Sequence, residues 1–224
     1  MRRVIRENSL SIVFLSFFLL ALAGQGYAGW HAFNEDATAH DESTLSLGRY
    51  LLSSSFGNAV LENWQSEYLQ FTLYILLTVW FVQRGSPESK PPGHEGPGSD
   101  EEERVGAHAP RNAPRWARLT DWRGWVYANS LVLLMTGIWL TSWFGQSVTG
   151  WSEFNSEQIT HDQPTVSWVG YLGTADFWEA TLQNWQSEFL AVGSMAVFSI
   201  YLRQRGSPES KSVGAPHDAT GAEG

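Results

Sequence analysis

Two copies of the pentapeptide Asn-Trp-Gln-Ser-Glu contain the residues of this chain best suited to chemistry. The first copy runs from Asn63 to Glu67 and the second from Asn184 to Glu188. Residues four apart on a helix share a face, so each Asn should lie beside the Glu of its own copy. A carboxylate near hydrocarbon is costly unless it faces a bundle interior or water, which makes both Glu residues functional-site candidates.

The two carboxylates allow two interpretations. If Glu67 and Glu188 approach a common axis, with Gln25 and Gln146 nearby, the pair would bind a cation or share a proton. Alternatively, each Glu lies at headgroup depth near a helix N-terminus, where the helix dipole favours negative charge. The residues of this possible ion, proton or partner site are Asn63, Glu67, Asn184, Glu188, Gln25 and Gln146.

A repeated His-Asp pair, His40-Asp41 and His161-Asp162, offers imidazole and carboxylate groups that suit Zn²⁺. One His in each loop is too few for a ligand set without further partners. Hydrogen bonding in a surface loop, or helix capping by Asp, accounts for the pair more simply. We therefore predict neither a metal site nor a cofactor.

The chain lacks the local patterns of common enzymes. It has no cysteine, no nucleotide-binding glycine loop, no His-Glu-x-x-His run and no nucleophile elbow. These absences from the sequence lead us to predict that the protein is not an enzyme.

The repeated motifs belong to a longer duplication with a constant offset of 121 residues. The heptapeptide Arg84–Lys90 recurs verbatim at Arg205–Lys211. A register without gaps indicates one architecture built twice. In each heptapeptide, Gly and Pro would stop a helix while Arg and Lys anchor it at the cytoplasmic surface. A docking peptide is the alternative.

Four apolar segments predict an all-α integral membrane protein. The expected transmembrane helices cover residues 8–28, 64–83, 126–144 and 185–204, close to the roughly 17–25 residues that a spanning helix needs. Trp and Phe, twelve of each, gather at the ends of these segments, as expected at a membrane boundary. A cleavable signal peptide is the rival interpretation of the first segment, although its equivalent at 126–144 lies inside the chain.

The duplication divides the chain into two parallel helix-pair repeats of the same orientation. We predict membrane repeat 1 at residues 1–90 and membrane repeat 2 at 116–211, each with a long outer loop. The linker at 91–115 and the tail at 212–224 have little apolar content and should be disordered.

The distribution of Lys and Arg predicts the orientation. Of the fourteen, only Arg49 lies in the loops between paired helices. Positive residues stay on the cytoplasmic side, so both termini should be cytoplasmic and the loops 29–63 and 150–184 outside. The acidic outer face leaves no footprint for nucleic acid.

Each outer loop should have two parts. Residues 29–46 are polar and acidic, and we expect them to be irregular. Residues 47–63 carry apolar side chains at a spacing of four, which predicts an amphipathic helix on the outer interface, turning into or continuous with the membrane helix.

Taken with the Gly-Gln, Gly-Trp, Phe-Asn and His-Asp pairs, the pattern Asn-Trp-Gln-Ser-Glu-[Tyr/Phe]-Leu…Arg-Gly-Ser-Pro-Glu-Ser-Lys resembles a bacterial family of small multi-pass membrane proteins, a domain of unknown function. The resemblance covers nearly all of both copies. It implies a bacterial inner-membrane location and lends no activity, cofactor or catalytic residue.

The predicted function is a non-enzymatic envelope protein that binds a partner, or scaffolds a membrane complex, through its acidic outer loops. Its expected partners are the lipid bilayer and an envelope protein or a second copy of itself. The alternative is a small conductor of ions, protons or a solute with a site at Glu67 and Glu188.

Overall fold

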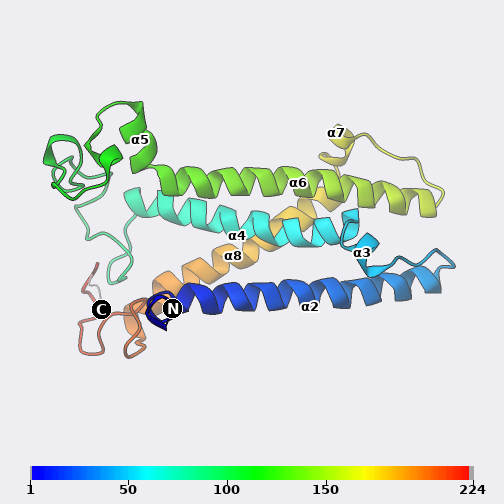
Figure 1. Ribbon diagram of the computed structural model, residues 1–224, viewed down its shortest axis with the longest axis horizontal. Coiled ribbons are helices and arrows are strands. Elements are labelled where there is room, and N and C mark those ends of the chain that lie inside the picture. The colour runs from blue at the N-terminus through cyan, green and yellow to red at the C-terminus, as the bar shows by residue number, and fades with distance from the viewer. Residues whose placement is uncertain (1, 222–224) are drawn as a thin grey trace. The chain divides into compact units, whose positions relative to one another are not determined.

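A computed structural model describes residues 2–221, and these residues contain helices and no strand. The long helices are α2 (Ser9–Ala39), α4 (Ser54–Trp80), α6 (Ser130–Thr160) and α8 (Ala175–Tyr201), in the order coloured in Figure 1. The short ones are α1 (Arg2–Glu7), α3 (Leu47–Tyr50), α5 (Trp122–Ala128), α7 (Trp168–Tyr171) and the 3₁₀ helices η1 (Gly106–His108) and η2 (Arg115–Arg118). The prediction of an all-α protein is confirmed for the described residues.

The helix bounds follow the offset of the sequence. Helices α2 and α6 have 31 residues each, α3 and α7 have 4 each, and α4 and α8 have 27 each. The breaks before α2 and α6 are also alike: the Nδ2 of Asn8 donates to the Val4 carbonyl, and that of Asn129 to the Trp125 carbonyl, each at 2.8 Å.

Helix α2 is longer than predicted, and the expectation that residues 29–46 are irregular is wrong as far as Ala39. The side chain of Asn34 pairs with the backbone of Leu45, donating to its carbonyl at 2.9 Å and accepting from its amide at 2.7 Å. The indole N–H of Trp30 donates to the same carbonyl at 2.6 Å. These bonds hold the returning loop against the helix and favour a helical 29–39.

The segment expected to form an amphipathic helix at 47–63 is divided. Its first residues form α3, a turn follows, and α4 then begins at Ser54 and continues without a break to Trp80. The hydroxyl of Ser53 accepts from the amide of Phe56 at 3.3 Å and caps the start of α4. The expected continuity with the following helix is present, but a separate interfacial helix over 47–63 is not.

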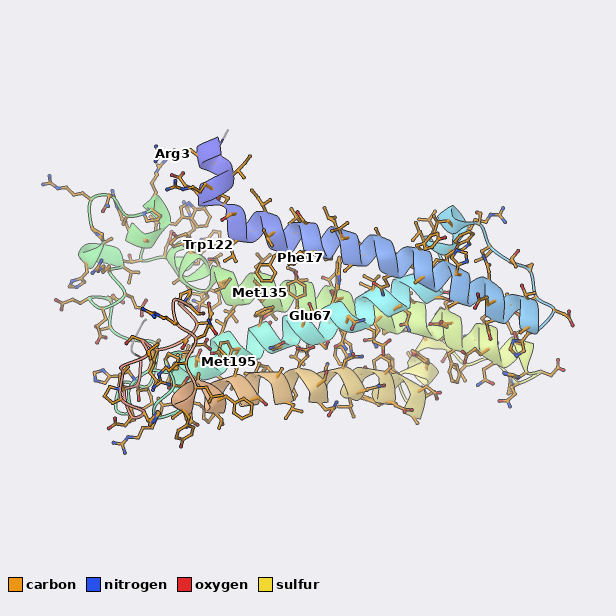
Figure 2. The ribbon with its side chains drawn as sticks, turned by 90° about the horizontal axis from the view of Figure 1, so that it is seen from below. Arg3, Phe17, Glu67, Trp122, Met135 and Met195 are labelled. Carbon is orange, nitrogen blue, oxygen red and sulfur yellow. The ribbon has the colours of Figure 1, made fainter. Side chains whose placement is uncertain are left out.

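Two helices, α2 and α6, are long and apolar enough to cross a membrane. Only 6% of the most apolar stretch of α2 and 17% of that of α6 is buried inside the structure. Phe17, labelled on α2 in Figure 2, is 62% exposed. Apolar surface left bare on this scale favours contact with lipid or another protein.

The chain forms two compact units that differ from the predicted repeats. Unit 1 comprises Met1–Val60 and Gly145–Trp168, and unit 2 comprises Leu61–Phe144 and Val169–Gly224. Each unit therefore draws on both predicted repeats. Helices α4 and α6 each contribute one end to unit 1 and the other to unit 2.

The interior of unit 1 is centred on Tyr50, which is 6% exposed. Its ring lies 5.7 Å from that of Phe33 and 5.6 Å from that of Phe56. Nearby on α4, a Cβ added to Gly57 would meet the Thr149 methyl group at 3.1 Å, so α4 and α6 pack closely here.

The interior of unit 2 is aromatic and polar. The ring of Trp143 lies 6.0 Å from that of Trp185 and 6.1 Å from that of Phe177. Several small or amide side chains are also buried in this unit, on α4, α6 and α8: Gln65, Ser66, Thr72, Ser142, Thr181 and Ser199.

The C-terminal tail, expected to be disordered, makes defined contacts over its described residues. The hydroxyl of Thr220 accepts from the amide of Gly85 at 2.8 Å, and the amide of Gly221 donates to the Ser86 carbonyl at 3.1 Å. The tail is held in place because its carbonyl groups accept hydrogen bonds from the ammonium group of Lys211. Without these bonds the buried ammonium group would lose partners, which is costly.

Candidate functional site

The Asn-Trp-Gln-Ser-Glu motifs join α4 to α8 inside unit 2. The indole N–H of Trp185 donates to Gln65 Oε1 at 2.7 Å, and Gln65 is fully buried. One turn away, Asn184 Nδ2 donates to Glu62 Oε1 at 3.2 Å and to the Ala180 carbonyl at 2.9 Å. The motif thus contributes to packing between helices, a role for Gln65 that the sequence interpretation missed.

The predicted carboxylate pair lies on these same helices. Glu67 is exposed on α4 (Figure 2), and Glu188 on α8 is half-buried. The two carboxylates lie near enough for their charges to interact. A site shared by Glu67 and Glu188 remains a prediction, as does the part of Asn63 in it.

The two glutamines expected near this pair belong to unit 1. Gln25 is exposed on α2, whereas Gln146 on α6 is 2% exposed. The Oε1 atom of Gln146 is buried and has no hydrogen-bond partner among the described residues. Equivalent positions of the duplication therefore have different environments.

The His-Asp pairs end the first long helix of each predicted repeat. Asp41 and Asp162 adopt left-handed backbone conformations, with φ of 57° and 54°. After α2, the amide of Glu42 donates to the Ala37 carbonyl at 2.7 Å, and that of Asp41 to the Thr38 carbonyl at 3.4 Å. This is the Schellman arrangement.

His40 bonds locally, with its Nδ1 3.0 Å from the carbonyl oxygen of Asp36. Within residues 2–221, no group of three or more His, Cys, Asp or Glu residues is arranged to hold a metal ion. The weak metal candidates His40, Asp41, His161 and Asp162 therefore have a structural explanation as helix ends.

The ends of α2 and α6 hold their loops with the same set of bonds. The indole N–H of Trp151 donates to the Val166 carbonyl at 2.8 Å, as that of Trp30 does to Leu45. Asn155 donates to the same carbonyl at 3.0 Å and accepts from the Val166 amide at 2.9 Å. The loops are therefore fixed to rigid helix ends.

These two helix ends contact each other within unit 1. Thr160 Oγ1 donates to Glu42 Oε1 at 3.1 Å. The carboxylate of Glu153 accepts hydrogen bonds from the side chains of Ser55 and Asn58. Seven acidic residues and one basic residue, Arg49, lie in the segments 29–60 and 145–168. Unit 1 therefore presents a folded acidic surface.

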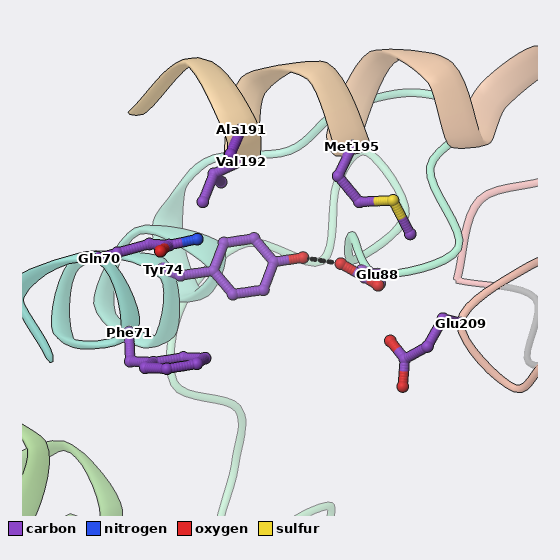
Figure 3. A pocket seen from close by; sticks show the side chains of 8 residues that line it. All are labelled: Gln70, Phe71, Tyr74, Glu88, Ala191, Val192, Met195 and Glu209. Atoms are coloured by element: carbon purple, nitrogen blue, oxygen red, sulfur yellow. Dashed lines mark hydrogen bonds between the residues drawn. The ribbon is translucent and has the colours of Figure 1, made fainter. Parts of the chain in front are cut away.

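A second polar cluster, missed by the sequence interpretation, lies where α4 and α8 end in unit 2. The Tyr74 hydroxyl donates to the Glu88 carboxylate, and Glu209 lies opposite (Figure 3). A hydrogen bond with Glu88, and its negative charge, raise the pKa of Glu209. The signal that could have found this cluster was the Glu in each copy of the repeated heptapeptide.

The family comparison covers nearly the whole chain. Residues 1–222 match the model of a domain of unknown function, DUF6766. The chain belongs to this family. No curated protein and no solved structure matched the chain. The family therefore supports the grouping and assigns no activity to any of the residues described above.

Proposed function

We propose that this DUF6766 protein is a multi-pass protein of the bacterial inner membrane that binds a partner through an acidic outer surface. In this proposal it has no enzymatic activity and acts as a binding or scaffold protein. The partner is a protein with a cationic surface, or a second copy that presents one. The folded acidic surface of unit 1 is the observation that carries the proposal.

The lengths of α2 and α6 support an outer surface built on helices. Each has 31 residues, which at the rise of an α-helix corresponds to about 46 Å. The hydrocarbon core of a bilayer is only about 30 Å thick. The apolar parts of α2 and α6 come first, so their polar C-terminal parts would stand in water.

The hydrogen bonds that fix the loops to the ends of α2 and α6 support a role for these loops in recognising a partner, beyond connecting one helix to the next. Connections without a function are usually short and mobile. Here each loop is fastened by one Trp and one Asn. Tyr50, which belongs to the first loop, is buried in unit 1. A surface already ordered before binding loses less conformational entropy when a partner docks.

We further propose that α4 and α8 also cross the membrane, which gives four crossings with both termini cytoplasmic. Each has 27 residues, or about 40 Å. The heptapeptides with Arg and Lys follow both helices, as expected at a cytoplasmic boundary. Since Glu67 is exposed, we do not propose ion conduction.

Topology is tested first. Because the chain has no cysteine, each introduced cysteine is the only one that can be labelled. Single variants Glu35→Cys, Glu157→Cys and Ser99→Cys would be treated in intact cells with a membrane-impermeant maleimide. We expect labelling at 35 and 157, and labelling at 99 only after the cells are opened. Labelling of all three positions in intact cells would contradict the topology.

Partner binding is tested with the same outer cysteine. A cleavable crosslinker at Glu35→Cys should give an adduct of defined mass that disappears when Asp36→Asn and Glu157→Gln are added. Neutralising Glu101 and Glu102 in the linker provides a matched loss of charge and should leave the adduct unchanged. An adduct that is insensitive to the outer charges, or none at all, would overturn the proposed function.

A further inference from the structure

An apolar groove runs between α4 and α8 in unit 2. It has a volume of about 460 Å³, and its lining includes Leu73, Leu77, Phe81, Phe189, Val192 and Gly193. Small-molecule sites typically enclose about 300–1,000 Å³. The groove is therefore large enough for a hydrocarbon chain.

Beside the groove lies a second pocket of about 260 Å³, shown in Figure 3, whose lining is mostly apolar but includes two carboxylates. The two cavities are adjacent, since Gln70, Tyr74 and Val192 line both. The pocket ends at the carboxylates of Glu88 and Glu209. Taken together, the two adjacent cavities offer an apolar part along the helices and an acidic end.

The acidic end has no cationic partner from the described chain. None of the ion pairs found within residues 2–221 includes Glu88 or Glu209. The lysines of the same heptapeptides bond elsewhere: Lys211 Nζ donates to carbonyl groups, among them that of Gly85 at 2.6 Å, and Lys90 Nζ donates to that of Gly96. The two carboxylates instead interact with each other and with Tyr74.

We propose that this cavity binds one bilayer lipid with an ammonium headgroup, its hydrocarbon chain along α4 and α8 and its ammonium group between Glu88 and Glu209. An ammonium group has donors for both carboxylates, and the opposite charges are complementary. The apolar lining removes the chain from water. This site is separate from the outer acidic surface, and its test does not depend on the partner proposed above.

Binding would be measured by calorimetry on the full chain in a nonionic detergent, with three probes of equal chain length. These are n-decylammonium, decanoate and decyl glucoside. We expect decylammonium to bind and the other two only to partition weakly. Equal heats for all three would show simple detergent-like partitioning and would overturn the proposal.

The acidic end is tested by the double variant Glu88→Gln and Glu209→Gln. Loss of the charge-assisted hydrogen bonds should weaken decylammonium binding by about tenfold or more. The matched double variant Glu101→Gln and Glu102→Gln removes equal charge from the linker and should bind like the parent. Unchanged binding by the Glu88/Glu209 variant would contradict the site.

The apolar part is tested by Gly193→Leu. A Cβ added at Gly193 meets nothing within 4 Å, so the larger side chain should enter the groove without disturbing the helix. Gly137 on α6 is equally open, which makes Gly137→Leu the matched control. We expect decylammonium binding to be lost only in Gly193→Leu, and equal binding by the two variants would place the chain elsewhere.

Binding should also depend on pH. Because the pKa of Glu209 is raised, its proton must leave before the ammonium group binds. Affinity should therefore increase as pH rises from about 5 to about 8, where a primary alkylammonium group stays charged. An affinity that falls over this range would contradict binding between the carboxylates.

Discussion

The two identical heptapeptides adopt the same turn and meet different surroundings. In the first, the amide of Gln83 donates to Ser89 Oγ at 2.8 Å; in the second, that of Gln204 donates to Ser210 Oγ at 2.9 Å. The glycines at 85 and 206 have φ of 87° and 83°. The seven residues therefore determine the turn, because the same bonds form in both places.

The difference lies in what covers each turn. Lys211 is 1% exposed, and its ammonium nitrogen lies within hydrogen-bonding distance of four carbonyl oxygens, those of Gly85, Pro216, His217 and Ala219. Lys90 is half-buried, and its bond is to the carbonyl of Gly96. The turn depends only on the seven residues themselves, whereas the burial of the lysine depends on the segment that follows. In the second copy that segment is the C-terminal tail, whose carbonyl groups contact Lys211.

The largest effect should come from Gly85→Ala compared with Gly206→Ala. Both variants place a side chain at positive φ, a strain of roughly 1–2 kcal/mol. At Gly85 the new Cβ would also lie 2.4 Å from the backbone carbonyl of His217, while at Gly206 it meets nothing within 4 Å. We expect Gly85→Ala to lose roughly 1–3 kcal/mol more in the free energy of unfolding.

Unfolding in detergent, followed by tryptophan circular dichroism, would measure this difference. Proteolysis of the C-terminal tail gives a second readout, since displacement of His217 should expose the tail only in Gly85→Ala. Equal losses in the two variants would mean that the tail does not cover the first turn.

The two Asn-Trp-Gln-Ser-Glu motifs make a second comparison. Gln65 is fully buried and accepts from the indole of Trp185, whereas the equivalent Gln186 is exposed. Gln65→Leu should destabilise the protein by about 1–3 kcal/mol, because a buried indole N–H loses its acceptor. Gln186→Leu should stay within about 0.5 kcal/mol.

The same unfolding measurement, with Trp185→Phe added to each variant, separates packing from hydrogen bonding. If the bond matters, Gln65→Leu should cost less when Trp185 is already Phe. An undiminished cost would show that the volume of Gln65, and not its bond, stabilises α4 against α8.

The features that could be predicted from the sequence depend on local patterns, whereas those that could not depend on contacts between residues distant in the chain. The all-α class and a capping role for Asp41 could be predicted, because periodicity and capping depend on neighbouring residues. The end of α2 could not, since Trp30 and Asn34 bond to Leu45 across a loop. The pairing of Glu88 with Glu209 also depends on residues distant in sequence, and the duplication only hinted at it.

The smallest effect should come from a feature in which the copies agree. Asp41→Gly and Asp162→Gly each relieve a left-handed backbone, with φ of 57° and 54°. Glycine tolerates that conformation, so each variant should gain up to about 1 kcal/mol in stability. Asp36→Gly is the control within α2, where glycine should cost roughly 0.5–1 kcal/mol. A loss of stability at Asp41 or Asp162 as large as that at Asp36 would mean that their carboxylates, and not their backbone conformation, end these helices. The His-Asp pairs would then again be candidates for a role beyond capping.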